Sequence, residues 1–454
     1  MDIAGKLYPT GRIGTTNYIL TPENIVNDMI NMLPADFWTP DVKVLDIFSK
    51  SGRFLMAAYK KLFNSPYLAD MDVAKRKRHI LTEQLFGLTD DFTCLLISER
   101  MLYGYAQYGK KNIRMIKDLQ SIVKDSDSER FRKAVEENFG KMKFDLVIGN
   151  PPYNDTNSTG SSKSVNTYFV KKGASITKRY MAFIMPDRWF VSSDALNSEC
   201  RRNMIGKIRY MRDFDNADEI FEGTKIAGGV SYFLYDKQYD GKMVYEDNRG
   251  QIKVKHTAKF MCKSTQSNIL YNHVKEIAKE YMDADFISTS FFGLTRDAVG
   301  NAVKTERSNI RLKSSGNDTF MNINDIPKNK QYAALYKVVI PYSAMNPKPF
   351  ILMPNEICTL TYLVVRFFDN ITEAENCKKY FETDFFKVLF GGLKTKLGST
   401  KENFACIPVQ DFTNQSDIDW SQSVTDIDRQ LYRKYKLTND EIAYIEKTFR
   451  TIKQ

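Results

Sequence analysis

Strand-like and helix-like segments alternate through the first half of this chain, and this alternation constrains the fold more than any other feature. The segments predicted as strands are 42–47, 85–89, 112–116, 144–148, 181–185 and 230–234. Helix-like segments follow the first two of them, at 54–62 and 92–102. Strands separated by helices predict βαβ units and a parallel, doubly wound α/β sheet. Because ligands bind beyond the carboxyl ends of such strands, polar residues there are the first candidates for a site.

The pattern changes after about Asp285. A region rich in Asn, Lys and Ser runs to Lys330, and β-like pieces at 336–340 and 358–367 and a helix-like stretch at 373–389 follow. The tail, 426–449, is predicted as amphipathic helix, with Thr438 or Asn439 as a cap. A chain of 454 residues exceeds one ordinary hydrophobic core. We therefore predict a first domain over 1–285 and a second, irregular α+β domain over 286–454.

Cysteine and histidine usage argues against two classes of chemistry. The six cysteines are scattered without a C-x-x-C pair, so we expect free thiols in a reducing cytosol and no zinc site. With only three histidines, chemistry that depends on a histidine base or a metal is poorly supplied. We predict a cytoplasmic protein with no membrane partner, because no apolar stretch could cross a bilayer and no signal-peptide pattern is present. A formal net charge of +11 suits nucleic acid, although many basic proteins bind none.

The stretch Asn150-Pro151-Pro152-Tyr153 directly follows the fourth predicted strand. Proline fixes φ and pushes the preceding residue into an extended conformation. The Asn150 side-chain oxygen and the Pro151 carbonyl can accept both N–H bonds of an aromatic amine, which exposes the nitrogen lone pair, and Tyr153 can stack on the ring. Fixed dipoles then meet the developing charge. A simple turn that closes the strand is the alternative reading. We predict these four residues as catalytic residues for chemistry on an amino-bearing ring.

Residues 46–52 form a small-residue turn between the first strand and its helix. Such a turn lets backbone N–H groups approach a ligand at a helix N-terminus, and Asp46 can hold an amino group or a ribose hydroxyl. Acids also end the second and third strands, at Asp90 or Asp91 and at Asp118. Each of these acids, taken singly, fits a helix cap equally well. The turn lacks the G-x-G-x-x-G spacing of a dinucleotide site, which disfavours a dehydrogenase.

In this order the motifs resemble those of amino-methyltransferases that use S-adenosylmethionine, and the NPPY form is typical of DNA adenine-N6 methyltransferases. The order is that of the gamma class, as in methylases of type II restriction–modification systems. The resemblance implies a Rossmann-like methyltransferase domain, a DNA target-recognition domain, double-stranded DNA as the substrate and a separate cognate restriction endonuclease as a further partner. The cofactor-binding residues it implies are Thr21, Pro22, Asp46, Ile47, Phe48, Ser49, Gly52, Asp90, Asp91, Asp118 and Leu119.

Three positions depart from the pattern of the family. Lys50 replaces a glycine and Ile47 replaces the proline of D-P-x-x-G-S-G, and Thr89 stands where the ribose-binding acid usually lies. The mechanism implied is direct transfer of a methyl group from the sulfonium to the amine of a base that has flipped out of the duplex. No covalent enzyme intermediate, metal or catalytic cysteine is required.

Several alternatives stay open beside this reading. Enzymes with an NPPY motif also methylate cytosine amino groups, RNA bases or a glutamine amide in proteins. Lys50 and Thr89 motivate a second class, a DNA-binding protein that recognises a site without methyl transfer. A fused restriction endonuclease is disfavoured, because only about twenty residues precede Thr21.

Two further sets of residues are weaker candidates. Trp189, Phe190 and the strand at 230–233 could form the other wall of a base pocket, but a place in the core is the expected role. The basic residues expected to face DNA, which surface solubility explains equally well, are Lys304, Arg307, Arg311, Lys313, Lys394 and Lys396.

Overall fold

The computed structural model describes residues 12–13, 18–153, 165–190, 192, 195–223, 226, 229–254, 261–282, 290–316, 318–343, 348–393, 399 and 401–450. The chain divides into two compact units. The first comprises Met1–Trp189 and Asp194–Ala258, and the second comprises Phe190–Ser193 and Lys259–Gln454. The functional division predicted after residue 285 stays a prediction. No helix in the described part of the chain combines the length and the apolar character that a membrane crossing needs.

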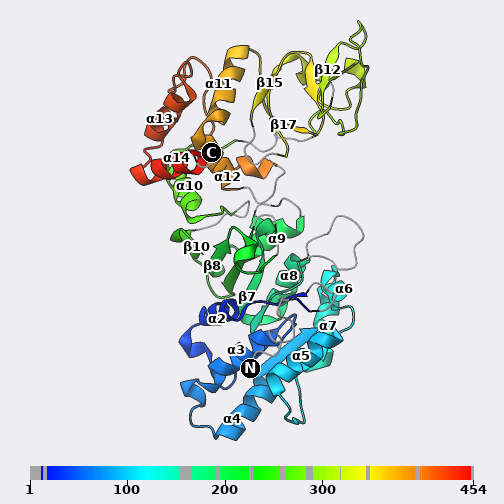
Figure 1. The fold of residues 1–454 in the computed structure, drawn as a ribbon, viewed down its shortest axis with the longest axis vertical. Coiled ribbons are helices and arrows are strands. Elements are labelled where there is room, and N and C mark those ends of the chain that lie inside the picture. The colour runs from blue at the N-terminus through cyan, green and yellow to red at the C-terminus, as the bar shows by residue number, and fades with distance from the viewer. Residues whose placement is uncertain are drawn as a thin grey trace. The chain divides into compact units, whose positions relative to one another are not determined.

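The first unit is built on one large mixed sheet (Figure 1). Its described strands, in spatial order, are β11 (Gly250–Val254), β10 (Met243–Asp247), β8 (Ile208–Phe214), β9 (Val230–Asp236), β7 (Thr177–Pro186), β6 (Phe144–Gly149), β3 (Val44–Asp46), β4 (Leu85–Thr89) and β5 (Ile113–Met115). A two-stranded antiparallel pair, β1 (Arg12–Ile13) and β2 (Tyr18–Ile19), precedes it. From β7 through β5 the pairing is parallel, so the predicted doubly wound α/β fold is confirmed.

Two groups of helices pack on this sheet, as a doubly wound fold requires. In one group α2 and α5 both contact α3, and in the other α8 contacts α6, α7 and α9. Their bounds are α2 (Glu23–Asn31), α3 (Arg53–Phe63), α4 (Val73–His79), α5 (Phe92–Tyr103), α6 (Leu119–Lys124), α7 (Ser128–Phe139), α8 (Asn166–Ile176) and α9 (Ala195–Met204). Met29 of α2, Leu55 of α3 and Ile148 of β6 are fully buried in one core. Truncating such a side chain to alanine typically costs about 2–5 kcal/mol.

The sequence-based prediction for the far edge of the sheet was wrong in two respects. The strand at 230–234 was predicted to close a parallel series, but β9 runs antiparallel to both neighbours, β7 and β8. The connection from β8 to β9 does not cross the sheet, and strands joined in this way run antiparallel. The sheet then continues into β10 and the hairpin strand β11, which were not predicted.

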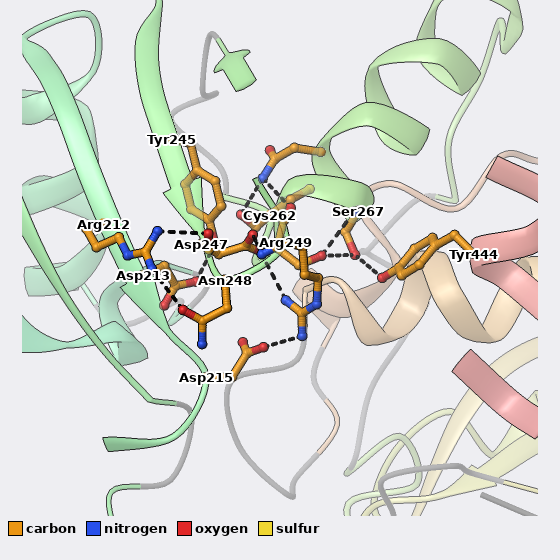
Figure 2. Close-up of polar contacts among 12 residues, drawn as sticks. Arg212, Asp213, Asp215, Tyr245, Asp247, Asn248, Arg249, Cys262, Ser267 and Tyr444 are labelled. Carbon is orange, nitrogen blue, oxygen red and sulfur yellow. Dashed lines mark hydrogen bonds and ion pairs between the residues drawn. The ribbon is translucent and has the colours of Figure 1, made fainter. Parts of the chain in front are cut away.

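Polar contacts hold β8 and β10 together at this edge (Figure 2). Arg212 of β8 donates to the Asp247 carbonyl and to the Asn248 side chain, both at 2.8 Å. Beside it, the Tyr245 hydroxyl of β10 donates to the Asp213 carboxylate of β8. These hydrogen bonds between residues distant in sequence stabilise the pairing of β8 with β10, and no local apolar pattern in the sequence predicts that pairing.

The second unit is an α+β structure, as predicted. Its described residues form two three-stranded sheets, one of β13 (Thr319–Met321), β12 (Ile310–Lys313) and β16 (Glu356–Cys358), and one of β15 (Phe350–Leu352), β14 (Tyr336–Pro341) and β17 (Tyr362–Phe368). Leu312, Val339 and Ile357 join both sheets in one core. The helices are α10 (Thr265–Ile277), α11 (Ile371–Glu382), α12 (Asp384–Gly391), α13 (Val424–Lys434) and α14 (Asn439–Arg450). The short helical turns among the described residues of both units are η2 (Ala35–Phe37), η3 (Pro66–Leu68), η4 (Ile80–Gln84), η5 (Asp187–Phe190), η6 (Ala217–Glu219), η7 (Ile323–Asp325), η8 (Lys330–Ala334) and η9 (Lys401–Phe404).

One helix that the sequence predicted as continuous is broken, and the helical tail divides where a helix start was predicted. The stretch 373–389 divides at Thr383, whose side chain accepts from the Phe386 N–H and caps α12. The tail 426–449 divides between α13 and α14, where Lys436 has a φ of 49°. Thr438 then forms a reciprocal cap with Glu441 at the start of α14, so Thr438 rather than Asn439 is the cap.

Candidate active site

The carboxyl ends of β3 and β6 lie side by side at the point where the strand order reverses. Asp46, the last residue of β3, is in register with Ile148 of β6, and the Ile47 N–H donates to the Ile148 carbonyl at 3.0 Å. From β3 the chain proceeds to β4 on one side, while β6 lies on the other. Ligands of doubly wound sheets bind at such a switch point. The turn after Asp46 and the stretch Asn150 to Tyr153 therefore face the same place.

Asn150 is held by one hydrogen bond that leaves its oxygen open. The residue is 3% exposed, and its Nδ2 donates to the Thr21 hydroxyl at 3.2 Å. The Asn150 Oδ1 is buried and makes no hydrogen bond to a described residue. A buried acceptor without a partner costs about 1–3 kcal/mol. Pro151 and Pro152 are buried behind it, so the amide is fixed with its acceptor ready for a donor from a ligand.

Tyr153 presents a ring beside this acceptor. The residue is half-buried, and its ring packs edge-on against Phe221 with a centroid separation of 6.4 Å. Burial raises the pKa of Tyr153 well above its ordinary value, and the charge of Asp187 raises it further, whereas the Asn150 amide acts in the opposite direction. The side chain is therefore a neutral phenol at any physiological pH. An aromatic face, and not a charge, is what it offers a ligand.

Asp46 and its turn are fixed by backbone hydrogen bonds on both sides. The Phe48 N–H donates to Asp46 Oδ1 at 3.3 Å, and the Ser49 N–H donates to the Leu88 carbonyl of β4 at 2.6 Å. Asp46 is 1% exposed, and this burial raises the pKa of its carboxyl to about 7 despite the opposing hydrogen bonds and the charge of Lys50. Asp46 is a buried acid close to its titration point near neutral pH, as groups in ligand sites often are.

Gly52, the N-cap residue before α3, has a backbone conformation that a side chain would oppose. Its φ is +75°, in the left-handed region. A Cβ at this position would also lie 3.1 Å from both the Cα and the carbonyl oxygen of Ser98 on α5. Glycine thus satisfies two demands at once, the sharp entry into the helix and the close approach of α3 to α5.

The three acids after β4 and β5 occupy different environments. Asp90 accepts hydrogen bonds from the Tyr18 hydroxyl and from Gln120 Nε2, each at 2.9 Å. Asp91 accepts from the Cys94 N–H at 2.8 Å and caps α5, which is the alternative role the sequence allowed. Asp118 is exposed with a φ of 58° at the start of α6, and Leu119 beside it is buried. Asp118 is thus the acid of this set that is presented to solvent.

A small cavity joins the motifs that the sequence placed far apart. It measures about 10 Å³, the room of roughly one water, and its lining includes Thr21, Asp46, Phe48, Lys50 and Asn150. Pro22, Ile47 and Ser49 are immediate neighbours of these residues in the chain, and Gly52 lies between Ser51 and Arg53, which also line the cavity. The predicted N-terminal motif, cofactor turn and catalytic stretch therefore meet. The described residues contain no group of His, Cys, Asp and Glu that could hold a metal ion.

Sequence reasoning missed three residues that organise this site. Tyr18 and Gln120 orient Asp90, and the Arg53 guanidinium donates to the Thr21 carbonyl at 2.7 Å. Tyr18 lies three positions before Thr21, and Gln120 directly follows Leu119, so both adjoin predicted motifs. The signal in the sequence that could have identified these two residues was that each is polar and lies next to a predicted motif. Nothing local shows that they meet, because residues 18 and 120 are far apart in the chain.

The weaker candidates have mixed outcomes. Trp189 and Phe190 are buried, as core residues are, and Trp189 packs against Phe233. In the second unit Lys304 and Arg307 are exposed, whereas Arg311 is paired with Asp318 and Glu356. Lys313 lies 3.9 Å from Asp318. Lys394 and Lys396 lie outside the described residues.

Known proteins resemble this chain in sequence and in fold. The family described as Eco57I restriction-modification methylase matches residues 83–221, which run from before β4 through Asn150 to Phe221. An uncharacterized adenine-specific methylase of Mycoplasma pneumoniae (strain ATCC 29342 / M129 / Subtype 1) is 27% identical over 288 residues, 49% of this chain and 68% of that protein. These matches confirm the predicted resemblance to adenine methyltransferases of the restriction–modification type, and hence an enzyme.

Solved structures extend the likeness in fold to both units. The type IIL restriction-modification enzyme MmeI, solved in complex with DNA, aligns over 97% of this chain and 80% of its own, with a TM-score of 0.52 and 9% identity. A modification subunit of a putative type I restriction enzyme from Vibrio vulnificus YJ016 aligns over 54% of this chain, with a TM-score of 0.38 and 12% identity. The chain spans about half the length of that subunit, 49%. The predicted methyltransferase fold with an added second unit is confirmed.

Proposed function

We propose that this protein transfers a methyl group from S-adenosylmethionine to the N6 amine of an adenine in double-stranded DNA. The observation that carries the proposal is the buried Asn150 Oδ1, which has no hydrogen-bond partner among the described residues and is fixed beside the Asp46 turn. An orphaned acceptor at a ligand site is matched by an N–H donor of the ligand. The adenine amine supplies such a donor, and the matching family and relative are adenine methylases.

The proposed role of these residues is to activate a poor nucleophile, the N6 amine of adenine. The N6 lone pair of adenine is delocalised into the ring. When Asn150 Oδ1 and the Pro151 carbonyl accept the two N–H bonds, the nitrogen becomes more tetrahedral and its lone pair is exposed. The exposed lone pair would accept the methyl group that bound S-adenosylmethionine supplies, with S-adenosylhomocysteine as the leaving group and one amine proton released to solvent. Acceptors already fixed by Pro151 and Pro152 meet the positive charge that develops on nitrogen.

The residues around the Asp46 turn fit the cofactor chemically. Bound S-adenosylmethionine supplies an electrophilic methyl group, and it carries an ammonium, a carboxylate and ribose hydroxyls that need partners. Asp46 is a buried acid for a cationic or hydroxyl group, and Thr21 lies in the same cavity. Gly52 allows the chain to turn closely into α3. Asp90, Asp91 and Asp118 with Leu119 lie at the ends of the next two strands, where the ribose and adenine would bind.

The second unit is proposed to recognise the DNA target. A base in a duplex reaches a pocket such as this one only by flipping out, at a cost of a few kcal/mol. Contacts elsewhere on the duplex must offset that cost. Exposed cations of the second unit, Lys304 and Arg307, suit phosphate contacts.

The test of this function is direct detection of its product. Duplex DNA incubated with the purified protein and S-adenosylmethionine is digested to nucleosides and analysed by mass spectrometry. We expect N6-methyl-2′-deoxyadenosine that depends on both protein and cofactor. Methylcytosine alone would reassign the substrate, and absence of any methylated nucleoside, with DNA binding retained, would favour a site-recognition protein without transfer.

The salt dependence of DNA binding tests the role of the second unit. Each phosphate contact releases counterions, so the affinity should fall steeply between about 50 and about 200 mM salt. We expect Lys304→Ala and Arg307→Ala each to lower the slope of log affinity against log salt by about 1. Fluorescence anisotropy with a labelled duplex measures this slope.

Arg311→Ala is the matched control for the salt experiment. Arg311 is already paired with Asp318 at 2.6 Å and with Glu356 at 3.1 Å, so removing it should change the slope less. An affinity that does not respond to salt would contradict DNA recognition through phosphates. Equal effects of all three substitutions would contradict the distinction drawn between Arg311, which is held in ion pairs, and the exposed Lys304 and Arg307.

A further inference from the structure

We infer that Lys50 binds the carboxylate of S-adenosylmethionine and thereby recognises the amino-acid end of the cofactor. This inference rests on the proposed function, because it assigns a role toward the same cofactor. Lys50 stands at a position of the turn where a glycine is usual, so the assignment concerns a departure of this chain from the common pattern.

The position of Lys50 places it among the residues proposed to hold the cofactor. It lies in the turn between β3 and α3, and its side chain lines the cavity shared by Thr21, Asp46 and Asn150. Its ammonium is 6.0 Å from the ring centroids of both Tyr18 and Phe48. A lysine in a surface loop normally extends into water, but Lys50 is only 9% exposed and is turned inward.

The hydrogen bonds of Lys50 leave most of its capacity unused. An ammonium has three N–H donors, and among the described residues Lys50 Nζ donates once, to the Ile19 carbonyl at 3.2 Å. Within the described part of the chain no carboxylate lies in ion-pair distance of it. The nearest acids have other partners, since Asp90 accepts from Tyr18 and Gln120 and Asp46 accepts from the Phe48 N–H. A buried cation of this kind is expected to gain an anionic partner.

The cofactor contains one group that can serve as the anionic partner of Lys50. S-adenosylmethionine carries a sulfonium and an ammonium, which Lys50 repels, and a single anionic group, the carboxylate. Burial lowers the pKa of Lys50 to about 8, and the charges of Asp46 and Asp90 oppose this, so the side chain is largely charged at neutral pH. With Lys50 on the carboxylate and Asp46 on the ammonium, the turn matches both charges of the amino-acid end.

Two ligands that differ only in the carboxylate test this assignment by calorimetry. S-adenosylhomocysteine has the carboxylate, and S-adenosyl-3-thiopropylamine lacks it. We expect Lys50→Met, which keeps the length of the side chain without its charge, to weaken binding of S-adenosylhomocysteine about 10- to 100-fold. Binding of S-adenosyl-3-thiopropylamine should stay within about 2-fold, because no ion pair is lost. Lys50→Gly, which restores the usual residue, should show the same selective loss.

Other outcomes would overturn the assignment and distinguish it from failure of the proposed function. Equal losses for both ligands would make Lys50 a structural residue, and tighter binding of both by Lys50→Gly would make it an obstruction of the site. In each of these cases the wild-type protein still binds S-adenosylhomocysteine and methylates adenine, so the proposed function stands. If the wild-type protein binds neither ligand and forms no methyladenine, the proposed function fails, and the role of Lys50 fails with it. Thermal unfolding of each variant confirms that it is folded.

Discussion

Asn150→Ala is expected to reduce methyl transfer roughly 100- to 1,000-fold, or about 2.7–4 kcal/mol, the effect typical of removing one preorganised hydrogen bond to developing charge. The substitution removes the buried Oδ1 that is proposed to accept from the adenine amine. Single-turnover kinetics with saturating DNA and cofactor measures the chemical step apart from binding.

The fold should tolerate this substitution well. Asn150→Ala loses the hydrogen bond to Thr21, but it also removes a buried acceptor that has no partner in the part of the chain that the structure describes. These two effects oppose each other, so the free energy of unfolding should change by less than about 1 kcal/mol. DNA affinity should stay near that of the wild type. The protein would then be stable and bind DNA, yet transfer almost no methyl groups.

Asn64→Ala is a matched control for the loss of an amide. Asn64 is exposed at the end of α3, where its side chain donates to the Lys60 carbonyl. Methyl transfer by this variant should equal that of the wild type. Transfer at the wild-type rate by Asn150→Ala itself would refute the role assigned to the Asn150 oxygen.

The place of the site could be predicted from sequence because it depends on local patterns. The apolar runs that became β3 and β6 are followed at once by Asp46 and by Asn150, and parallel strands bring such ends to one edge of the sheet. The cap at Thr438 was equally local, since its partner Glu441 is three residues away. A pattern within a few residues needs no knowledge of the rest of the fold.

The features that the sequence did not predict depend on distant partners. The break between α11 and α12 is stabilised by Asp428, whose carboxylate accepts from the N–H groups of Asp384 and Phe385 more than forty residues away. Asp90 was predicted to bind the cofactor or to cap a helix, and its hydrogen bonds to Tyr18 and Gln120, which come from distant segments, were not predicted. The direction of β9 likewise follows from where the chain re-enters the sheet. Such contacts between distant segments produce no periodic pattern in the sequence, so they cannot be predicted from it.

Asp46→Asn is expected to stabilise the free protein at pH 8 and to weaken cofactor binding. Burial raises the pKa of Asp46 from its ordinary value of 3.8 to about 7. In the folded protein the neutral carboxyl is favoured, so Asp46 binds a proton more tightly there than in the unfolded chain. Its contribution to stability is complete below about pH 4 and is lost as the pH rises through about 7. At pH 8 the folded protein therefore holds an unfavourable buried charge.

The neutral side chain of Asp46→Asn avoids that charge at every pH. The gain in the free energy of unfolding should be near zero at pH 4 and reach up to about 4 kcal/mol above pH 7, at about 1.4 kcal/mol per pH unit. Urea unfolding of both proteins at pH 4, 6 and 8 measures this difference, and titrations common to both proteins cancel. A variant that is less stable than the wild type at pH 8 would contradict the buried-charge account.

Cofactor binding should move in the opposite direction, because the same charge is what the ligand needs. We expect Asp46→Asn to weaken binding of S-adenosylhomocysteine about 10- to 100-fold, since its ammonium loses a buried anionic partner. Calorimetry at pH 8, where Asp46 is ionised in the wild type, gives the largest difference. A substitution that only repaired a structural defect would raise stability without this loss. Stability gained together with affinity lost would show that the buried acid is retained for the ligand, at the expense of the free fold.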